Sequence, residues 1–242
     1  MECDASLYLH YGACLPVEDT LARADTALAL GPGLAAAHVA RGLALVAQGR
    51  IEEAERVFER AIALEPDNDN AYYCYARACF QTGRMEDAAR LFRRAAELSP
   101  DDIYAPLTLV GIERGLGRAE EARAAARLML GRAERKLEGH PEDSHAAYAV
   151  ATALAVQGDR QSAVRWAERA LALAPDDHAT QYNVACVYSI LGEVDRTIDL
   201  LEHTMPGASA YRRAWMARDP DFDPLRSHPR FGALLRRLGA VT

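Results

Sequence analysis

Long apolar runs, lysine and aromatic residues are all scarce in this chain of 242 residues. No stretch approaches the roughly 18 uncharged apolar residues that a membrane-spanning helix needs, so the sequence predicts a soluble protein with no membrane partner. Lys136 is the single lysine among 28 basic residues, and aromatic residues make up 7%. The formal net charge is −7. This balance argues against a nucleic-acid partner, because such proteins usually present a basic face.

Paired cysteine motifs are also missing. The chain contains five cysteines and no C-x-x-C pair, which disfavours a disulfide framework or a structural zinc site. They are Cys3, Cys14, Cys74, Cys79 and Cys186. The N-terminal residues lack the basic region and apolar core of a signal peptide. We therefore expect free thiols in the cytoplasm.

Motifs for catalysis are absent as well. The sequence contains no G-x-S-x-G, P-loop or G-x-G-x-x-G motif, and its histidines include no i,i+4 pair. Asp219, Asp221 and Asp223 imitate the start of a calcium loop, but Pro224 replaces the required glycine and Arg230 the bidentate glutamate. We expect a hydrogen-bonded turn there. The sequence predicts that the protein is not an enzyme and uses no metal or cofactor.

Alanine dominates the apolar residues, with 48 copies. Alanine is the best helix former, and its small side chain lets helices approach closely. The composition therefore favours an all-α fold with many close contacts between helices.

A repeat of 34 residues is the main feature of the sequence. Residues 35–68 and 69–102 form two clear copies, and 144–177 forms a third. Weaker copies at 1–34, 103–143 and 178–205 complete a set of six. The first two copies share small residues, an aromatic and a proline at equal offsets: Gly42 and Ala76, Gly49 and Gly83, Ala54 and Ala88, Phe58 and Phe92, Ala61 and Ala95, Pro66 and Pro100.

Each copy predicts a helical hairpin. Two helices of about 13 residues flank a glycine turn, and the proline stops the second helix because it cannot continue the hydrogen-bond ladder. One hairpin cannot bury its apolar stripe alone, whereas stacked neighbours can. These residues resemble the tetratricopeptide repeat family. The resemblance implies an all-α, right-handed superhelical α-solenoid of six repeats over 1–205, followed by capping helices at 206–242.

The fourth copy departs from this spacing. Its closing proline, Pro141, arrives seven residues late. Seven residues rotate a helix by about 700°, only about 20° short of two full turns, so the second helix can lengthen without turning its apolar face. We predict a helix from about Ala119 to Leu137 that protrudes at one edge, with a bend at Gly131. A tolerated insertion and a spur for partner docking both remain open.

The tail after Met205 leaves the repeat pattern. Its apolar residues suit a cap over the last repeat. They are Trp215, Phe222, Leu225, Phe231 and Leu235. The tail also resembles the ends of bacterial tetratricopeptide arrays that are appended to signalling enzymes and transcriptional regulators.

The resemblance implies that the first helices line a concave groove. At the implied positions the early repeats offer an apolar strip, of Leu9, Val39, Leu43 and Val46. The later repeats offer polar and aromatic residues: Asn70, Tyr73, Arg77, Phe80, Tyr104, Arg114, His145, Tyr148, Tyr182 and Asn183. Tyrosine and arginine often anchor interfaces, and Arg77 and Arg114 favour an acidic side chain or carboxylate. Packing between repeats is the competing interpretation for each residue taken alone.

Three functions follow from this reading. The first is a non-catalytic scaffold that binds a peptide or partner protein in the groove. The second is a regulatory or oligomerising segment of a larger bacterial signalling enzyme or transcriptional regulator, with self-association through the apolar strip as a variant; the early start of the repeats favours a piece of a longer protein. The third, an RNA-binding repeat, is disfavoured by net charge and spacing. A chaperone-type carboxylate clamp is disfavoured by Val39, Leu43, Cys74, Tyr104 and Thr108 at the matching positions.

Overall fold

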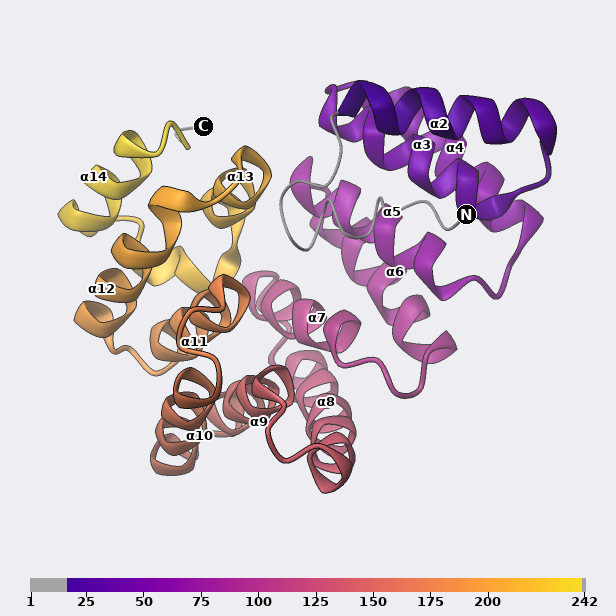
Figure 1. The fold of residues 1–242 in the computed structure, drawn as a ribbon. Helices are drawn as coiled ribbons and strands as arrows, with labels where there is room; N and C mark the ends of the chain where they lie inside the picture. Colours follow the sequence, from indigo (N-terminus) through magenta and orange to yellow (C-terminus); the bar gives the residue numbers. More distant parts are fainter. Residues whose placement is uncertain (1–16, 241–242) are drawn as a thin grey trace. The chain divides into compact units, whose positions relative to one another are not determined.

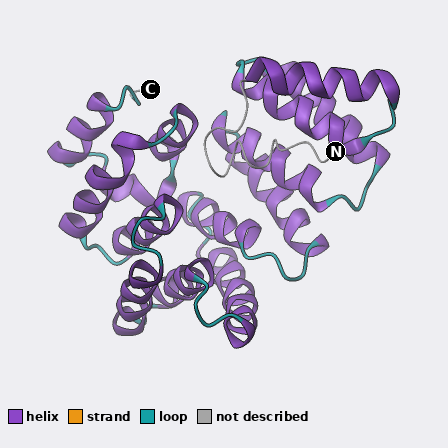
Figure 2. Cartoon of the chain, viewed as in Figure 1, coloured by secondary structure: helices purple, strands orange, loops and turns teal. Residues whose placement is uncertain are grey.

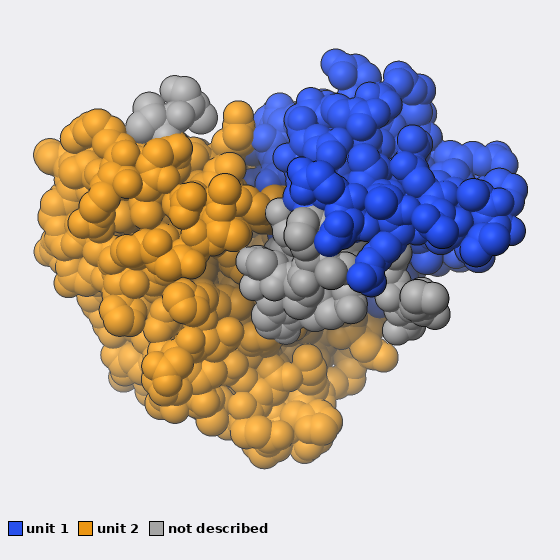
Figure 3. Space-filling model, turned by 45° about the horizontal axis from the view of Figure 1, so that its top comes forward, with its two compact units in different colours: residues 1–99 blue, residues 100–242 orange. Residues whose placement is uncertain are grey.

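The computed structural model describes residues 17–240, and every regular element among them is a helix (Figure 2). This confirms the all-α repeat fold. The predicted first helix of the first repeat, with Leu9, Cys3 and Cys14, lies outside the described residues. The chain divides into two compact units, Met1–Ser99 and Pro100–Thr242, coloured separately in Figure 3.

The first unit consists of helices that pack on their neighbours in sequence (Figure 1). They are α2 (Val17–Leu30), α3 (Ala35–Ala47), α4 (Ile51–Leu64), α5 (Asp69–Gln81) and α6 (Met85–Leu98). Helices α3 and α4 form one hairpin and α5 and α6 the next, and α5 packs against both helices of the preceding hairpin.

The second unit continues the hairpins and ends in the tail. Its hairpin helices are α7 (Tyr104–Gly115), α8 (Ala119–Gly139), α9 (Ser144–Gln157), α10 (Arg160–Leu173), α11 (His178–Ile190) and α12 (Val194–Thr204). The tail forms η1 (Met205–Gly207), α13 (Ala210–Arg218), η2 (Pro220–Leu225) and α14 (Pro229–Arg237). Even the longest described helix is too charged to cross a bilayer.

Local chemistry sets the ends of each hairpin. Gly83 and Gly158 have φ angles of 79° and 88°, a left-handed conformation that glycine adopts without a Cβ penalty. Asn68 and Asp177 cap the following helices, accepting hydrogen bonds from the backbone N–H groups three residues later. The second helices end two residues before a proline, at Leu64, Leu98, Gly139 and Leu173.

Small residues bring the helices of a hairpin into close contact. A Cβ atom at Gly42 would lie 2.8 Å from the ring of Phe58, which is fully buried. The ring of Phe58 in turn stacks on Tyr75 of the next hairpin, with centroids 5.3 Å apart. The alternation of small and large residues therefore links α3, α4 and α5.

Helix α8 confirms the prediction of an extended second helix. It has 21 residues, whereas α4, α6 and α10 each have 14, so it is longer by the seven residues that delay Pro141. Its buried residues still form one stripe along the helix: Ala122, Ala125, Ala126, Met129, Arg132 and Ala133. Helix α8 extends two residues beyond the predicted end, and Gly131 lies inside it.

The tail builds a core with the last hairpin. Phe222, Leu225 and Phe231 are almost fully buried against residues of α11 and α12, and Trp215 and Leu235 pack at the edge of this core. Burying one large apolar side chain contributes about 1.5–3 kcal/mol. The tail is therefore part of the second unit rather than an appended segment.

Candidate binding surface

The residues expected to line a groove fall into both units. The first unit holds Val39, Leu43, Val46, Asn70, Tyr73 and Arg77. The second holds Tyr104, Arg114, His145, Tyr148, Tyr182 and Asn183.

Helix α5 brings Asn70, Tyr73 and Arg77 together at helical spacing. Arg77 Nη1 donates a hydrogen bond of 3.3 Å to the hydroxyl of Tyr73, and its guanidinium lies 5.7 Å from the centre of that ring. The Tyr73 ring meets the edge of Phe92 of α6 at 5.4 Å. Asn70 is exposed, and Tyr73 and Arg77 are half-buried. The aromatic ring is thus held on two sides, which lowers the entropy cost of using it to bind a partner.

The apolar strip expected on α3 is largely covered. Val39 is 3% and Leu43 6% exposed, and only Val46 is half-buried. Helix α3 packs against α2, α4 and α5, and its small residues let these helices approach closely. The expectation of an open apolar strip is therefore corrected for Val39 and Leu43.

In the second unit, Tyr104 and His145 belong to a hydrogen-bond chain that joins three helices. The hydroxyl of Tyr104 lies 2.7 Å from His145 Nδ1, and His145 Nε2 lies 3.2 Å from Asp177 Oδ2. The same oxygen accepts hydrogen bonds from the N–H and hydroxyl of Thr180. Although burial raises the pKa of Asp177, the bonds from Thr180 and His145 hold it below its ordinary value. The chain ties the N-terminal ends of α7, α9 and α11 together.

Two of the expected groove residues are engaged within their own helices. Tyr148 is 1% exposed and its ring packs on that of His145, 5.3 Å away. Asn183 donates a hydrogen bond of 2.8 Å to the carbonyl of Ala179. The exposure expected for Tyr148 is thus corrected, because α9 is enclosed by α8, α10 and α11.

The tail covers the other two residues, Arg114 and Tyr182. Arg114 Nη1 forms an ion pair with Asp221 Oδ1, and the Tyr182 hydroxyl donates a hydrogen bond of 2.6 Å to Asp219 Oδ2. Ser189 donates a bond of 2.6 Å to the carbonyl of Asp221. The segment Asp219–Leu225 thereby lies on α7 and α11. The acidic group that Arg114 was expected to attract comes from the chain itself.

Glycines on α7 permit this approach. A Cβ atom at Gly111 would lie 3.4 Å from Asp221 Oδ2, and one at Gly115 would lie 2.5 Å from Pro220 Cβ. The second distance is below any normal contact between carbon atoms. Pro220 can therefore occupy its place only beside a residue without a side chain.

Burial strongly affects the two carboxyl groups of this segment. Asp219 and Asp221 are 7% and 8% exposed. Burial raises the pKa of both, and the neighbouring Asp219 charge adds to the rise for Asp221, which reaches about 7 against the lowering effect of Arg114. Burial and the nearby carboxylates also raise the pKa values of Tyr182 and Cys186.

The thiol of Cys186 completes a cluster with these carboxylates. One ligand-type atom from each of Cys186, Asp219 and Asp221 lies within 4.8 Å of the others. The carboxylate oxygens already bind Arg114, Tyr182 and the backbone N–H of Asp221. The expected hydrogen-bonded turn is confirmed, since Asp219 accepts the bond from Asp221 and opens η2.

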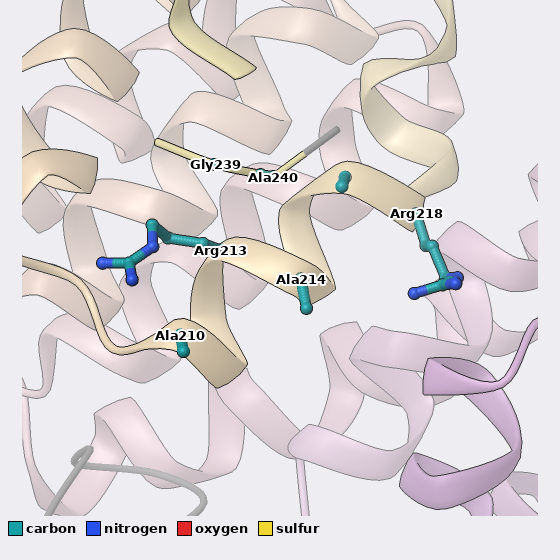
Figure 4. A pocket seen from close by; sticks show the side chains of 7 residues that line it. Ala210, Arg213, Ala214, Arg218, Gly239 and Ala240 are labelled. Atoms are coloured by element: carbon teal, nitrogen blue, oxygen red, sulfur yellow. The ribbon is translucent and has the colours of Figure 1, made fainter. Parts of the chain in front are cut away.

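A hollow of about 200 Å³ lies beside α13 (Figure 4). It is lined by Ala210, Arg213, Ala214, Ala217, Arg218, Gly239 and Ala240. Figure 4 shows the side chains of Arg213 and Arg218 far apart along α13, at the left and the right of the view. Arg213 also donates to the carbonyl of Ala208 at 2.6 Å. The two cations therefore do not converge on one ligand.

Sequence reasoning missed the partners of the groove residues. In the sequence, Asp219 and Asp221 indicate only an incomplete calcium loop, and no motif marks Ser189 or Asp177. The signal that could have found the tail contact is the pair Gly111 and Gly115, since two glycines four residues apart in a helix expose one bare face.

Comparisons with known proteins agree with this architecture. The model of a tetratricopeptide repeat family matches residues 39–103. No curated protein sequence matches the chain. In the crystal structure of the APC/C hetero-tetramer Cut9–Hcn1, a chain is 17% identical with a TM-score of 0.61, covering 97% of this chain and 48% of its own length. This chain thus spans about half of that neighbour.

Two neighbours of similar length share the fold. A tetratricopeptide repeat protein from Parabacteroides merdae ATCC 43184 is 14% identical with a TM-score of 0.57, covering 98% of this chain and 90% of its own. PilF of Pseudomonas aeruginosa is 16% identical with a TM-score of 0.56, covering 86% and 91%. The match places tetratricopeptide repeats at residues 39–103, and the glycine-turn hairpins and the neighbours show that the chain has the fold of tetratricopeptide repeat proteins.

Proposed function

We propose that the protein is a non-catalytic scaffold that binds a peptide or partner protein through the first-helix face of its first unit. The observation that carries the proposal is the arrangement on α5, where exposed Asn70 stands one turn from a tyrosine anchored by Phe92 and Arg77. Anchored aromatic and arginine side chains are typical of interface hot spots. The family match supports the same function, and a chain similar in fold is part of the Cut9–Hcn1 hetero-tetramer.

The ligand is expected to carry an acidic group. Arg77 offers a planar set of donors that suits a carboxylate, and Asn70 can both donate to and accept from an extended peptide backbone. The second unit supplies a precedent within the chain, because Arg114 already binds the carboxylate of Asp221. We place the protein in the cytoplasm, in agreement with the unpaired thiols of Cys74, Cys79 and Cys186.

Phage-displayed random dodecapeptides provide a direct test. Peptides selected on the intact protein should be rich in Asp or Glu. Replacing Asn70, Tyr73 and Arg77 together by alanine should weaken the binding of a selected peptide at least about tenfold, equivalent to ~1.4 kcal/mol. Titration calorimetry measures the dissociation constants.

A matched control uses the opposite side of the same hairpin. Glu86, Arg93 and Glu97 are exposed on α6, and replacing all three by alanine should leave the affinity unchanged. Equal losses in both triple variants, or full binding by the α5 variant with its helical circular dichroism intact, would refute the proposed surface.

A further inference from the structure

The contact between the tail and the hairpins buries more negative charge than positive charge. Asp219 and Asp221 both lie inside the second unit, and Arg114 is the cation that directly binds one of their carboxylates. Two buried carboxylates that share a site cannot both ionise without a large cost, whereas one shared proton removes that cost.

We propose that Asp219 and Asp221 form a proton-dependent latch, in which one proton held by the pair fixes Asp219–Leu225 on α7 and α11. When the segment lifts away, water solvates both carboxylates and that proton is released. The latched form therefore holds one more proton than the open form. Loss of the proton at rising pH favours release, which would uncover Arg114 and Tyr182.

The groups that face the pair come from each element packed against it. Helix α7 contributes a cation, α11 a phenol and a thiol, α13 an indole, and the residue after η2 a second cation. These are Arg114, Tyr182, Cys186, Trp215 and Arg226. Arg226 binds the carbonyls of Ala217 and Asp219 and the exposed carboxylate of Asp223 rather than the carboxylates of the pair. Arg226 and the bonds from Tyr182 and Trp215 lower the pKa of Asp219, but Arg114 is the cation bonded directly to a carboxylate of the pair, and a shared proton offsets the remaining charge.

The raised pKa values agree in direction with this latch. The pKa of Asp221 is about 7 in the latched form, mainly because of burial and the Asp219 charge. An exposed aspartate has a pKa near 3.9. A folded pKa above the open one means that the latch is fully stabilised below about pH 4 and is weakened as the pH rises through about 7.

The latch is distinct from the proposed ligand surface, because it lies in the second unit and involves none of Asn70, Tyr73 and Arg77. Either proposal can fail while the other holds. Opening of the latch can be followed by amide exchange, because the N–H groups of Phe222, Arg226 and His228 donate hydrogen bonds to carbonyls of the segment.

Hydrogen–deuterium exchange of the full chain at pH 6, 7 and 8 tests the latch. After correction for intrinsic exchange rates, peptides covering 219–228 should show an opening constant about tenfold larger at pH 8 than at pH 6, as expected for a group with a latched pKa of about 7. Peptides from α5 and α6 serve as the internal reference and should not change. If the ratio of the opening constants of the tail and reference peptides is the same at pH 6 and pH 8, the latch proposal is wrong.

Two matched variants assign the effect to the pair. Asp221→Asn removes the titrating group and should abolish the pH dependence of tail exchange. Asp223→Asn makes the same change at an exposed position of the same segment and should leave the tenfold dependence intact. Loss of the dependence in both variants, or its persistence in Asp221→Asn, contradicts the proposal. If Asp221→Asn fails to fold, Asp219→Asn and the wild-type profile still decide the question.

Discussion

Arg114 near the end of α7 forms an ion pair with Asp221 of η2, a residue 107 positions later in the sequence. The pair joins α7 to the tail and uses an arginine that the sequence predicts to face a ligand. Its energetics can be separated from packing by changing the pH.

Arg114→Ala should destabilise the protein more at pH 8 than at pH 6. At pH 8 the variant leaves an ionised Asp221 in a buried site, at a cost of about 2–3 kcal/mol, somewhat below a fully buried pair because the Arg114 side chain is 27% exposed. At pH 6 Asp221 takes up a proton, since its pKa is raised to about 7. The loss of stability caused by Arg114→Ala is therefore smaller at this pH. Urea unfolding at both pH values measures it, with Arg127→Ala on the exposed face of α8 as the control. Equal losses at the two pH values would contradict this assignment.

Two glycine-to-alanine changes should have opposite effects on the free energy of unfolding. Gly42→Ala places a methyl group 2.8 Å from the Phe58 ring and should cost about 1–3 kcal/mol, because the ring is fully buried and cannot retreat. Gly131→Ala in α8 meets only Arg135 Nη1 at 3.8 Å and should stabilise the helix by about 0.5–1 kcal/mol. Thermal unfolding of the two variants under identical conditions provides the comparison. A destabilised Gly131→Ala would show that this glycine has another role.

Asp177 should contribute to acid sensitivity. Asp177→Ala removes the cap of α11 and the bond to His145, and should cost about 1–2 kcal/mol at pH 7, whereas Asp177→Asn keeps a capping side chain. The folded pKa of Asp177 is lowered, so its charge stabilises the protein above about pH 4 and this contribution is lost as the pH falls further. The stability difference between wild type and Asp177→Asn should therefore shrink between pH 5 and pH 3 in urea titrations. A difference that does not change with pH would be incompatible with the charge effect.

Tyr104→Phe should loosen the link between α7 and α9. It removes the 2.7 Å bond to His145 but keeps the ring, whose centroid lies 5.9 Å from that of the imidazole. The expected loss is about 0.5–1.5 kcal/mol by chemical denaturation. His145→Ala removes the bonds to both Tyr104 and Asp177 and should therefore lower the stability more than Tyr104→Phe does. A smaller loss in His145→Ala would contradict the hydrogen-bond chain.

The hairpins could be predicted because single residues set their ends. Gly49, Gly83 and Gly117 recur at equal spacing, and each has a positive φ angle in the structure. The late arrival of Pro141 predicted the length of α8 because a helix that keeps its apolar stripe has few ways to absorb seven residues.

The contacts of the tail with Arg114 and Tyr182 could not be predicted in the same way. The position of Asp221 depends on how Phe222 and Leu225 are buried against α11 and α12, which is a property of packing outside the repeat. The offset of Tyr182 within the 34-residue repeat predicts which face of its helix the side chain occupies. It does not predict which other segment packs against that face. The same limit applies to Tyr148, whose burial depends on three neighbouring helices.

The two added turns of α8 are a place where residues can be deleted from the repeat. Removing seven residues from the middle of α8 would restore the common repeat length. It would rotate the C-terminal half of the helix by only about 20° relative to the N-terminal half. Removing five would rotate it by about 140° and expose Ala133 while burying charged residues. A change of seven residues at this point thus keeps the buried stripe in phase, whereas a change of five does not.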